Sequence, residues 1–118
     1  MVSFFGWRLP VQYSGLLDEH RAVRGAAGLF DVSHMGEILF EGPGALEGVQ
    51  SLVTNDCAKL APGQVLYTVA CREDGGVLDD LLIYRLAEER FLMVVNAANA
   101  SKMAAWCESR LGDSLDLR

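Results

Sequence analysis

Residues 64–96 read QVLYTVACREDGGVLDDLLIYRLAEERFLMVVN, and this stretch determines the fold class that the sequence predicts. Three runs in it, 64–72, 77–86 and 90–96, are rich in the β-branched and aromatic residues that favour strands. Short polar turns at 73–76 and 87–89 separate the runs. Because turns this short join antiparallel neighbours, the pattern predicts a three-stranded antiparallel meander.

The segments before the meander predict helix and strand in alternation. Residues 15–28 have helical spacing, with Ser14 as a candidate N-cap and Gly28 as a candidate C-terminal cap. Residues 31–41 alternate and predict a strand, which places one set of side chains on a common face: Val32, His34, Gly36, Ile38 and Phe40. The glycine in that set is a candidate bulge or point of close approach.

The remaining segments complete the predicted order. Gly42-Pro43 is expected to start a helix whose inner stripe is Leu46, Val49, Leu52 and Val53. Residues 54–63 are expected to form a loop, and residues 99–111 a final helix with Asn99 as a candidate N-cap. The tail 112–118 is a candidate further strand, and the aromatic, irregular segment 1–13 is expected to pack over a core.

These elements predict an α+β fold in which helices pack on one face of a mainly antiparallel sheet. A length of 118 residues suits a single domain, spanning 1–118. The net charge of −6 argues against nucleic acid as a partner, and the apolar runs are too short to span a membrane. No targeting segment is visible at the N-terminus, which favours a cytoplasmic location.

The cysteines and histidines argue against a disulfide framework and a metal site. The three cysteines are odd in number and widely spaced, as expected for reduced thiols. The two histidines, His20 and His34, have no ligand spacing that would predict zinc. Asp31, Ser33 and His34 do not form a catalytic triad, because neighbours on a strand point to opposite faces.

The adjacent carboxylates of Asp79 and Asp80 are the strongest candidate for chemistry. Asp79 shares a strand face with Val77, Leu81 and Ile83, whereas Asp80 shares the other face with Leu78, Leu82 and Tyr84. Both faces are apolar, so two interpretations remain. The acids either bond to amides of the nearby turn, or one of them lies in an apolar pocket suited to proton transfer or to binding an amine. The apolar context favours the second interpretation for one of the two.

Two polar residues lie within reach of this acid pair in the predicted meander. Tyr67 lies on the strand paired with the acid strand and is either a neighbour of the carboxylates or a packing aromatic. Asn96 closes the last strand and is either a site residue or a helix cap.

Five motifs, in consecutive order along nearly the whole chain, resemble the N-terminal region of the aminomethyltransferase family, the T-protein of the glycine cleavage system. The motifs are FFGWRLPVQY (4–13), EHRAVRGAAGLFDVSHMGE (19–37), LVTNDCAKLAPGQVLYT (52–68), EDGGVLDDLLIYRL (73–86) and FLMVVNAAN (91–99).

The resemblance implies a reaction and a set of site residues. Family members transfer a one-carbon unit from an aminomethyl group on the lipoyl arm of H-protein to tetrahydrofolate, and release ammonia. It implies tetrahydrofolate as the acceptor substrate, H-protein as a partner and no metal. It assigns the critical carboxylate, which contacts the folate amines, to Asp79, and leaves Asp80 a structural role. Folate-lining positions correspond to Met35, Leu66, Tyr67, Tyr84 and Asn96.

Family members are several times longer than this chain, and some of their folate-binding residues correspond to positions beyond residue 118. We therefore expect the 118 residues alone to be inactive, and their uncovered apolar surface to favour self-association. Two alternatives stay open: a non-catalytic folate-binding module, and a folded remnant that only oligomerises.

Overall fold

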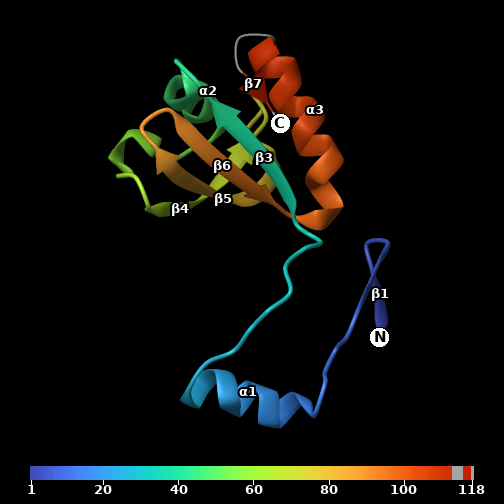
Figure 1. Ribbon diagram of the computed structural model, residues 1–118. Helices are drawn as coiled ribbons and strands as arrows, with labels where there is room; N and C mark the ends of the chain where they lie inside the picture. Colours follow the sequence, from blue (N-terminus) through green and yellow to red (C-terminus); the bar gives the residue numbers. More distant parts are fainter. Residues whose placement is uncertain (113–115, 118) are drawn as a thin grey trace. The chain divides into compact units, whose positions relative to one another are not determined.

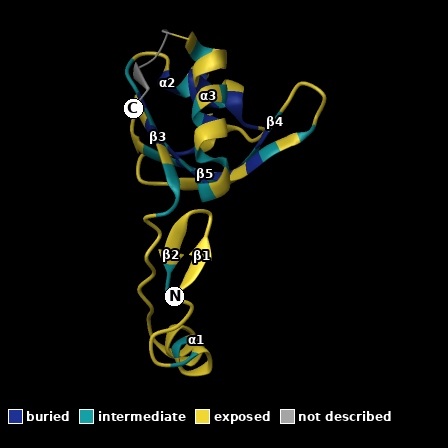
Figure 2. Ribbon diagram, turned by 90° about the vertical axis from the view of Figure 1, so that its right-hand side faces the viewer, coloured by how far each residue is buried: buried dark blue, intermediate teal, exposed yellow. Residues whose placement is uncertain are grey.

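The computed structural model describes residues 1–112 and 116–117, and the chain divides into two compact units, residues 1–34 and 35–118. The two units differ in burial. Buried residues occur throughout the sheet and helices of the C-terminal unit, whereas the N-terminal unit is almost entirely exposed (Figure 2). The core therefore belongs to the C-terminal unit.

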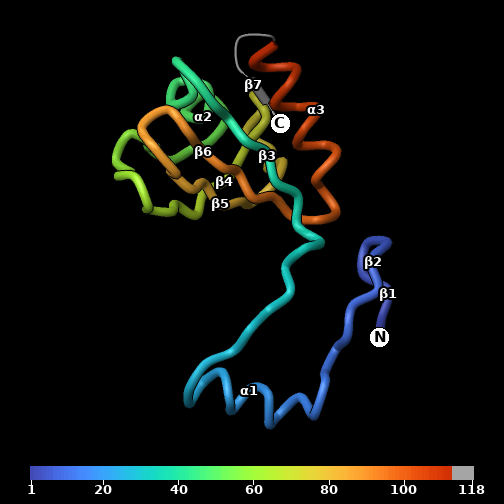
Figure 3. Tube along the Cα trace, in the orientation of Figure 1, coloured from blue at the N-terminus to red at the C-terminus, as the bar shows by residue number. Residues whose placement is uncertain are grey.

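The C-terminal unit is built on an antiparallel sheet with the strand order β4-β5-β6-β3-β7 (Figure 1). Its strands are β3 (Gly36–Glu41), β4 (Val65–Cys71), β5 (Val77–Ala87), β6 (Arg90–Val95) and β7 (Asp116–Leu117). The predicted meander is confirmed, because the chain runs from β4 through β5 to β6 by short turns (Figure 3). The predicted further strand in the tail is confirmed at residues 116–117, whereas 113–115 and 118 lie outside the described residues.

Helices cover one face of this sheet. They are α2 (Ala45–Leu52), the 3-10 turns η1 (Cys57–Lys59) and η2 (Ala97–Asn99), and α3 (Ala100–Leu111). Together with alternate residues of the strands they enclose one continuous core, which confirms the predicted α+β class. The largest fully buried side chains are Phe40, Phe91, Leu81, Ile83, Met93, Met103, Val49, Val95, Thr68, Cys57 and Cys107.

Strand alternation explains which residues enter the core. In β6, Phe91, Met93 and Val95 are buried, whereas Leu92 and Val94 between them are half-buried on the opposite face. Complete burial of one such apolar side chain contributes about 1.5–3 kcal/mol. The helix-covered face therefore supplies most of the apolar stabilisation of this unit.

The N-terminal unit is a small hairpin followed by a helix. Strand β1 (Val2–Phe4) pairs with β2 (Trp7–Leu9), so the expectation of an irregular segment at 1–13 is wrong. All but one residue of this hairpin are exposed within the N-terminal unit. The expected packing of this segment over a core stays a prediction. Helix α1 (Leu16–Gly25) follows, and none of its residues is buried.

Helix α1 is shorter than predicted and is capped differently. Its N-cap is Gly15 rather than Ser14, and the Glu19 carboxylate accepts the backbone N–H groups of Tyr13, Ser14 and Gly15 at 2.6–3.0 Å. These bonds tie the two residues before the helix, and its N-cap Gly15, to the first turn of the helix. The helix ends at Gly25, before the predicted cap Gly28, because no packed face supports a further turn.

The strand predicted at 31–41 begins only at Gly36. The Asp31 carboxylate accepts the N–H of Ser33 at 2.9 Å, and this local turn replaces strand pairing over residues 31–35. The predicted common face therefore fails for Val32 and His34, whereas Ile38 and Phe40 are buried as predicted.

Other predicted boundaries shift slightly. Helix α2 begins two residues later than Pro43, after Gly44 in the left-handed conformation, and its stripe residues Val49 and Leu52 are buried. The predicted loop 54–63 contains the short turn η1. Asn99 stands at the N-cap of α3 as predicted, but its side chain makes no capping hydrogen bond.

Gly36 is a point of close approach between β3 and α3, as the sequence suggested. A Cβ atom at this position would lie 2.6 Å from the Ala100 Cβ and 2.8 Å from the Val95 Cγ2. Helix α3 therefore packs against β3 closely enough to exclude a methyl group.

We predict that Gly36→Ala destabilises the C-terminal unit by about 1–3 kcal/mol, because the added methyl forces β3 and α3 apart. Denaturant unfolding followed by circular dichroism measures this loss. The control is Gly25→Ala at the end of α1, where an added Cβ meets no atom within 4 Å. A Gly36→Ala protein as stable as the wild type would contradict the close approach.

Candidate functional site

The two adjacent carboxylates point to opposite faces of β5. Asp79 faces the helix-covered side and is 3% exposed, whereas Asp80 faces the other side and is exposed. That other side of β4, β5 and β6, which we call the open face, carries Tyr67, Asp80, Leu82, Tyr84 and Val94. The sequence expectation that one acid is buried is therefore met by Asp79.

The Asp79 carboxylate is engaged by neutral donors from the corner between β6 and α3. Its Oδ2 accepts the backbone N–H of Asn96 at 3.0 Å. Its Oδ1 accepts the side-chain amides of Asn96 at 2.9 Å and Asn99 at 2.7 Å. Buried carboxylates need such partners, and these bonds join β5 to the start of α3.

The ligand contact expected of Asp79 stays a prediction, and the structure describes only its contacts within the protein. Its oxygens already accept three hydrogen bonds from the protein, and Leu81, Ile83 and Val95 on the same face are buried in the core. A ligand reaching Asp79 would have to displace part of the β6–α3 corner.

Asp80 is the accessible carboxylate of the pair. The Tyr67 hydroxyl donates to its Oδ2, and the Asn96 side-chain amide donates to its Oδ1 at 3.1 Å. The hydrogen bond from Tyr67 holds the pKa of Asp80 below its ordinary value. No lysine or arginine within the described residues forms an ion pair with it. Its negative charge therefore faces outward, balanced only by neutral donors.

Tyr67 adds an exposed aromatic ring next to this carboxylate. It pairs directly with Leu82 across the β4–β5 ladder, so it reaches Asp80 along the diagonal, and its side chain is 64% exposed. The hydrogen bond to Asp80 and the negative charge of Asp80 raise the pKa of the Tyr67 phenol. Tyr67 is therefore a neighbour of the acid pair, as one of the two sequence interpretations proposed.

The other predicted site residues are distributed over both faces. Tyr84 lies half-buried on the open face, and Asn96 lies where the two faces meet. Leu66 lies on the helix-covered face and packs against the core, so the structure separates it from Tyr67. Met35 is half-buried in the turn just before β3.

Two residues of this hydrogen-bonded site had been given other roles in the sequence analysis. Asn99 was expected only to cap a helix, and Asp80 was expected to be structural. The strand register could have pointed to Asp80. Leu82 pairs with Val94, so Asp80, two residues before Leu82, lies opposite Asn96. The role of Asn99 depends on how η2 turns the chain, which residue pattern alone does not give.

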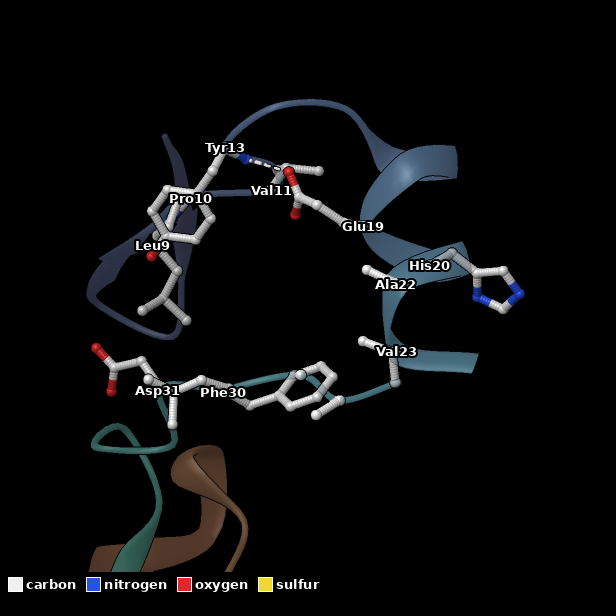
Figure 4. Close-up of a pocket in the computed structure, with 13 residues that line it drawn as sticks. Leu9, Pro10, Val11, Tyr13, Glu19, His20, Ala22, Val23, Phe30 and Asp31 are labelled. Carbon is white, nitrogen blue, oxygen red and sulfur yellow. Dashed lines mark hydrogen bonds between the residues drawn. The ribbon is translucent and has the colours of Figure 1, made fainter. Parts of the chain in front are cut away.

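A separate hollow of about 550 Å³ lies within the N-terminal unit, between residues 9–13, α1 and residues 27–31. Figure 4 shows the His20 imidazole pointing away from it and Glu19 bonded to the Tyr13 amide. Its two carboxylates, Glu19 and Asp31, are both engaged by backbone N–H groups. The lining of this hollow is therefore mainly apolar, with two carboxylates that each accept backbone N–H groups.

The described residues contain no cluster of three His, Cys, Asp or Glu side chains placed to hold a metal ion. Cys57, Cys71 and Cys107 are free thiols, and burial raises the pKa of Cys57 and of Cys107 to about 11. Within the part of the chain that the structure describes, no helix has the length and apolar character needed to cross a bilayer.

Comparison with known proteins places these residues in context. The family model described as GCVT N-terminal domain matches residues 1–118. An aminomethyltransferase from Halothermothrix orenii is 58% identical over 106 residues, covering 90% of this chain and 30% of the relative. One from Natranaerobius thermophilus is 51% identical over 118 residues, covering 100% of this chain and 32% of the relative.

A solved structure agrees with the sequence relatives. The crystal structure of glycine cleavage system aminomethyltransferase T from Bartonella henselae matches with a TM-score of 0.88 and 43% identity, over 99% of this chain and 32% of that one. The chain thus spans about a third of the length of the relatives that it matches.

We predict that Asp80→Asn lowers the pKa of Tyr67, because the substitution weakens the hydrogen bond that the phenol donates to Asp80 and removes the negative charge of Asp80, and both raise that pKa. Phenolate absorbance, taken as the difference between each protein and its Tyr67→Phe variant, isolates this one tyrosine. The control is Asp74→Asn, which removes a carboxylate from the β4–β5 turn. An identical Tyr67 titration in the wild type and in Asp80→Asn would contradict the pairing.

The same pair predicts a change of stability at alkaline pH. The pKa of Tyr67 is raised in the folded state, so its contribution is complete below the unfolded value of about 10. That contribution falls as the pH rises through the folded pKa, because the unfolded chain then binds fewer protons. As the pH rises through this alkaline range, the denaturation midpoint should fall more steeply in the wild type than in Tyr67→Phe. If the midpoints of the two proteins fall in parallel, the pKa of Tyr67 is not raised in the folded state.

Proposed function

The chain belongs to the GCVT N-terminal domain family, and from this premise we propose that residues 1–118 act as one domain that supplies a tetrahydrofolate-binding surface of an aminomethyltransferase. In this proposal the folate accepts a one-carbon unit from the aminomethyl-lipoyl arm of H-protein, and ammonia is released. The proposal extends to a cytoplasmic setting, and it needs no metal.

The observation that carries the proposal is the pair of exposed side chains Asp80 and Tyr67 on the open face, which bond to each other while half-buried Asn96 donates to Asp80. A reduced pterin has a flat pyrimidine ring fused to a puckered reduced ring, and it carries several N–H donors. An exposed carboxylate accepts such donors, and the neighbouring Tyr67 ring provides an aromatic contact. The apolar side chains of Leu82 and Val94 around the acid suit the non-polar part of the ring.

The same carboxylate suits the charge that develops during transfer. Loss of ammonia from the S-aminomethyl group leaves a positively charged carbon that only the lipoyl sulfur stabilises. A folate nitrogen then attacks this carbon, and the lipoyl sulfur leaves as a thiolate. A fixed negative charge at this point stabilises the positively charged carbon without needing to reorganise. Asp80 has no cationic partner in the described residues that would neutralise it.

We therefore assign the ligand-contacting role to Asp80 rather than to Asp79, the residue that the family resemblance suggested. The buried position of Asp79 and its three intramolecular hydrogen bonds support this assignment. Tyr67, Tyr84 and Asn96 remain proposed folate contacts, and Met35 remains one at the edge of β3. Leu66 would act through packing from the covered face.

Because the chain spans about a third of its relatives' length, the complete reaction and docking of H-protein are proposed for a longer protein. The 118 residues alone are proposed to bind folate weakly and to lack turnover. The binding step is therefore the one to test on this chain.

We predict that Asp80→Asn weakens binding of tetrahydrofolate by at least about tenfold in calorimetry, since a charged hydrogen bond is lost. The matched control is Asp74→Asn, which removes a carboxylate from the β4–β5 turn. This variant should bind like the wild type. The absence of binding heat in the wild type would sink the proposed function. If Asp80→Asn binds tetrahydrofolate like the wild type, another residue must make the proposed contact with the folate.

A second candidate, a folded remnant that only oligomerises, is favoured by the exposed apolar side chains of the N-terminal unit. Phe5 is 64% exposed, Phe30 67% and Leu29 101%. Single exposed apolar residues are ordinary, but a group of them in one short segment is typical of a contact surface.

We predict concentration-dependent self-association in light scattering, and its reduction by the combined change of Phe5, Leu29 and Phe30 to serine. Replacement of three exposed polar residues of α3, Ser101, Glu108 and Ser109, by alanine is the control. A monomer at every concentration would rule out the oligomer. A stable multimer without heat from tetrahydrofolate would favour the remnant over the folate-binding domain.

A further inference from the structure

The Asn96 carboxamide is the one side chain in the described site that bonds to both aspartates. Its Nδ2 lies 2.9 Å from the Asp79 Oδ1, 2.9 Å from the Asp80 backbone oxygen and 3.1 Å from the Asp80 Oδ1. All three neighbours are acceptors, so the nitrogen end of the amide must face them. Asn96 therefore has a single orientation compatible with its surroundings.

Asp79 enforces that orientation because an ionised carboxylate only accepts hydrogen bonds. Its three donors, two from Asn96 and one from Asn99, leave no position where an N–H group would fit. An asparagine in place of Asp79 would turn its own amide nitrogen toward at least one of these donors. The substitution would therefore disturb Asn96 even though it preserves the shape of the side chain.

Asn99 fixes Asp79 from the helix side. It occupies the N-cap position of α3 but makes no capping bond, and it donates its amide to Asp79 at 2.7 Å instead. The Asn99 side chain therefore stabilises the contact with β5 instead of the first turn of its own helix. Lys102 donates to the Leu78 carbonyl at 2.6 Å, which ties the same turn of α3 to β5.

The amide of Asn96 also lies between two like charges. Two neighbouring carboxylates repel each other, and the amide hydrogens place positive partial charge between the Asp79 Oδ1 and the Asp80 Oδ1. Loss of this amide would let the Asp80 side chain turn away, and Tyr67 would lose its acceptor.

We propose that Asp79 and Asn99 are positioning residues: from the buried side of the sheet they fix the Asn96 amide, which holds Asp80 and Tyr67 in place on the open face. This inference rests on the proposed function only for its link to folate. The positioning itself is a property of the chain without ligand.

The first test uses the Tyr67 titration as a ligand-free report on Asp80. Asn99→Ala touches neither Tyr67 nor Asp80 and changes no charge. It should nevertheless lower the pKa of Tyr67 toward that found in Asp80→Asn. Asp79→Asn cannot serve in this test, because the negative charge of Asp79 itself raises the pKa of Tyr67. Ala100→Gly is the matched control, because it weakens the start of α3 but keeps all five side chains of the network. A Tyr67 titration that moves equally in Ala100→Gly, or in none of the variants, would overturn the proposal.

A measurement on the wild type keeps the proposal testable if a variant fails to fold. The Asn96 side-chain amide hydrogens should exchange with solvent at least about tenfold more slowly than those of Asn55, an exposed asparagine. Equal exchange rates would contradict a fixed amide.

Calorimetry with tetrahydrofolate then separates the two proposals. Weaker binding by Asn99→Ala than by Ala100→Gly supports both, whereas equal binding by the two overturns the functional part of the inference. If the wild type gives no binding heat but the Tyr67 titration responds to Asn99→Ala, the proposed function fails and the positioning network stands.

Discussion

The alternation of side chains along β5 is the constraint on which the site depends. Neighbouring residues of a strand point to opposite faces, so the adjacent acids Asp79 and Asp80 must have different surroundings. Helices α2 and α3 cover one face, and Asp79 therefore takes its partners from the start of α3. Asp80 points to the exposed face. It is the carboxylate of the pair that a ligand can reach without displacing the fold.

The meander was predictable because its signals are local and agree with one another. Turn residues at 73–76 separate alternating strands and make them antiparallel neighbours, although the register shifts between Ala70 and Cys71. The N-terminal third was harder, since its structure depends on side chains that bond to the backbone. Glu19 replaces Ser14 in satisfying the start of α1, and Asp31 forms a turn where a strand pattern was expected.

For the acid pair, the sequence pattern predicted the residues of the site but not which face of the sheet is covered. The pattern identified Asp79 and Asp80 together with Tyr67 and Asn96, and the structure brings these four side chains together. The pattern did not distinguish the covered face from the open one, because both faces of β5 are apolar. That distinction comes from where α3 packs, and the close approach at Gly36 is the contact that places α3 on the side of Asp79.

The central claim is that Asp80, and not Asp79, receives the folate amines. The most direct test is to follow the carboxyl carbons of both aspartates by NMR, in aspartate-labelled protein assigned through the Asp79→Asn and Asp80→Asn variants, while tetrahydrofolate is added. The account predicts that the Asp80 signal shifts with saturation and that the Asp79 signal stays in place. A shift confined to Asp79 would contradict it.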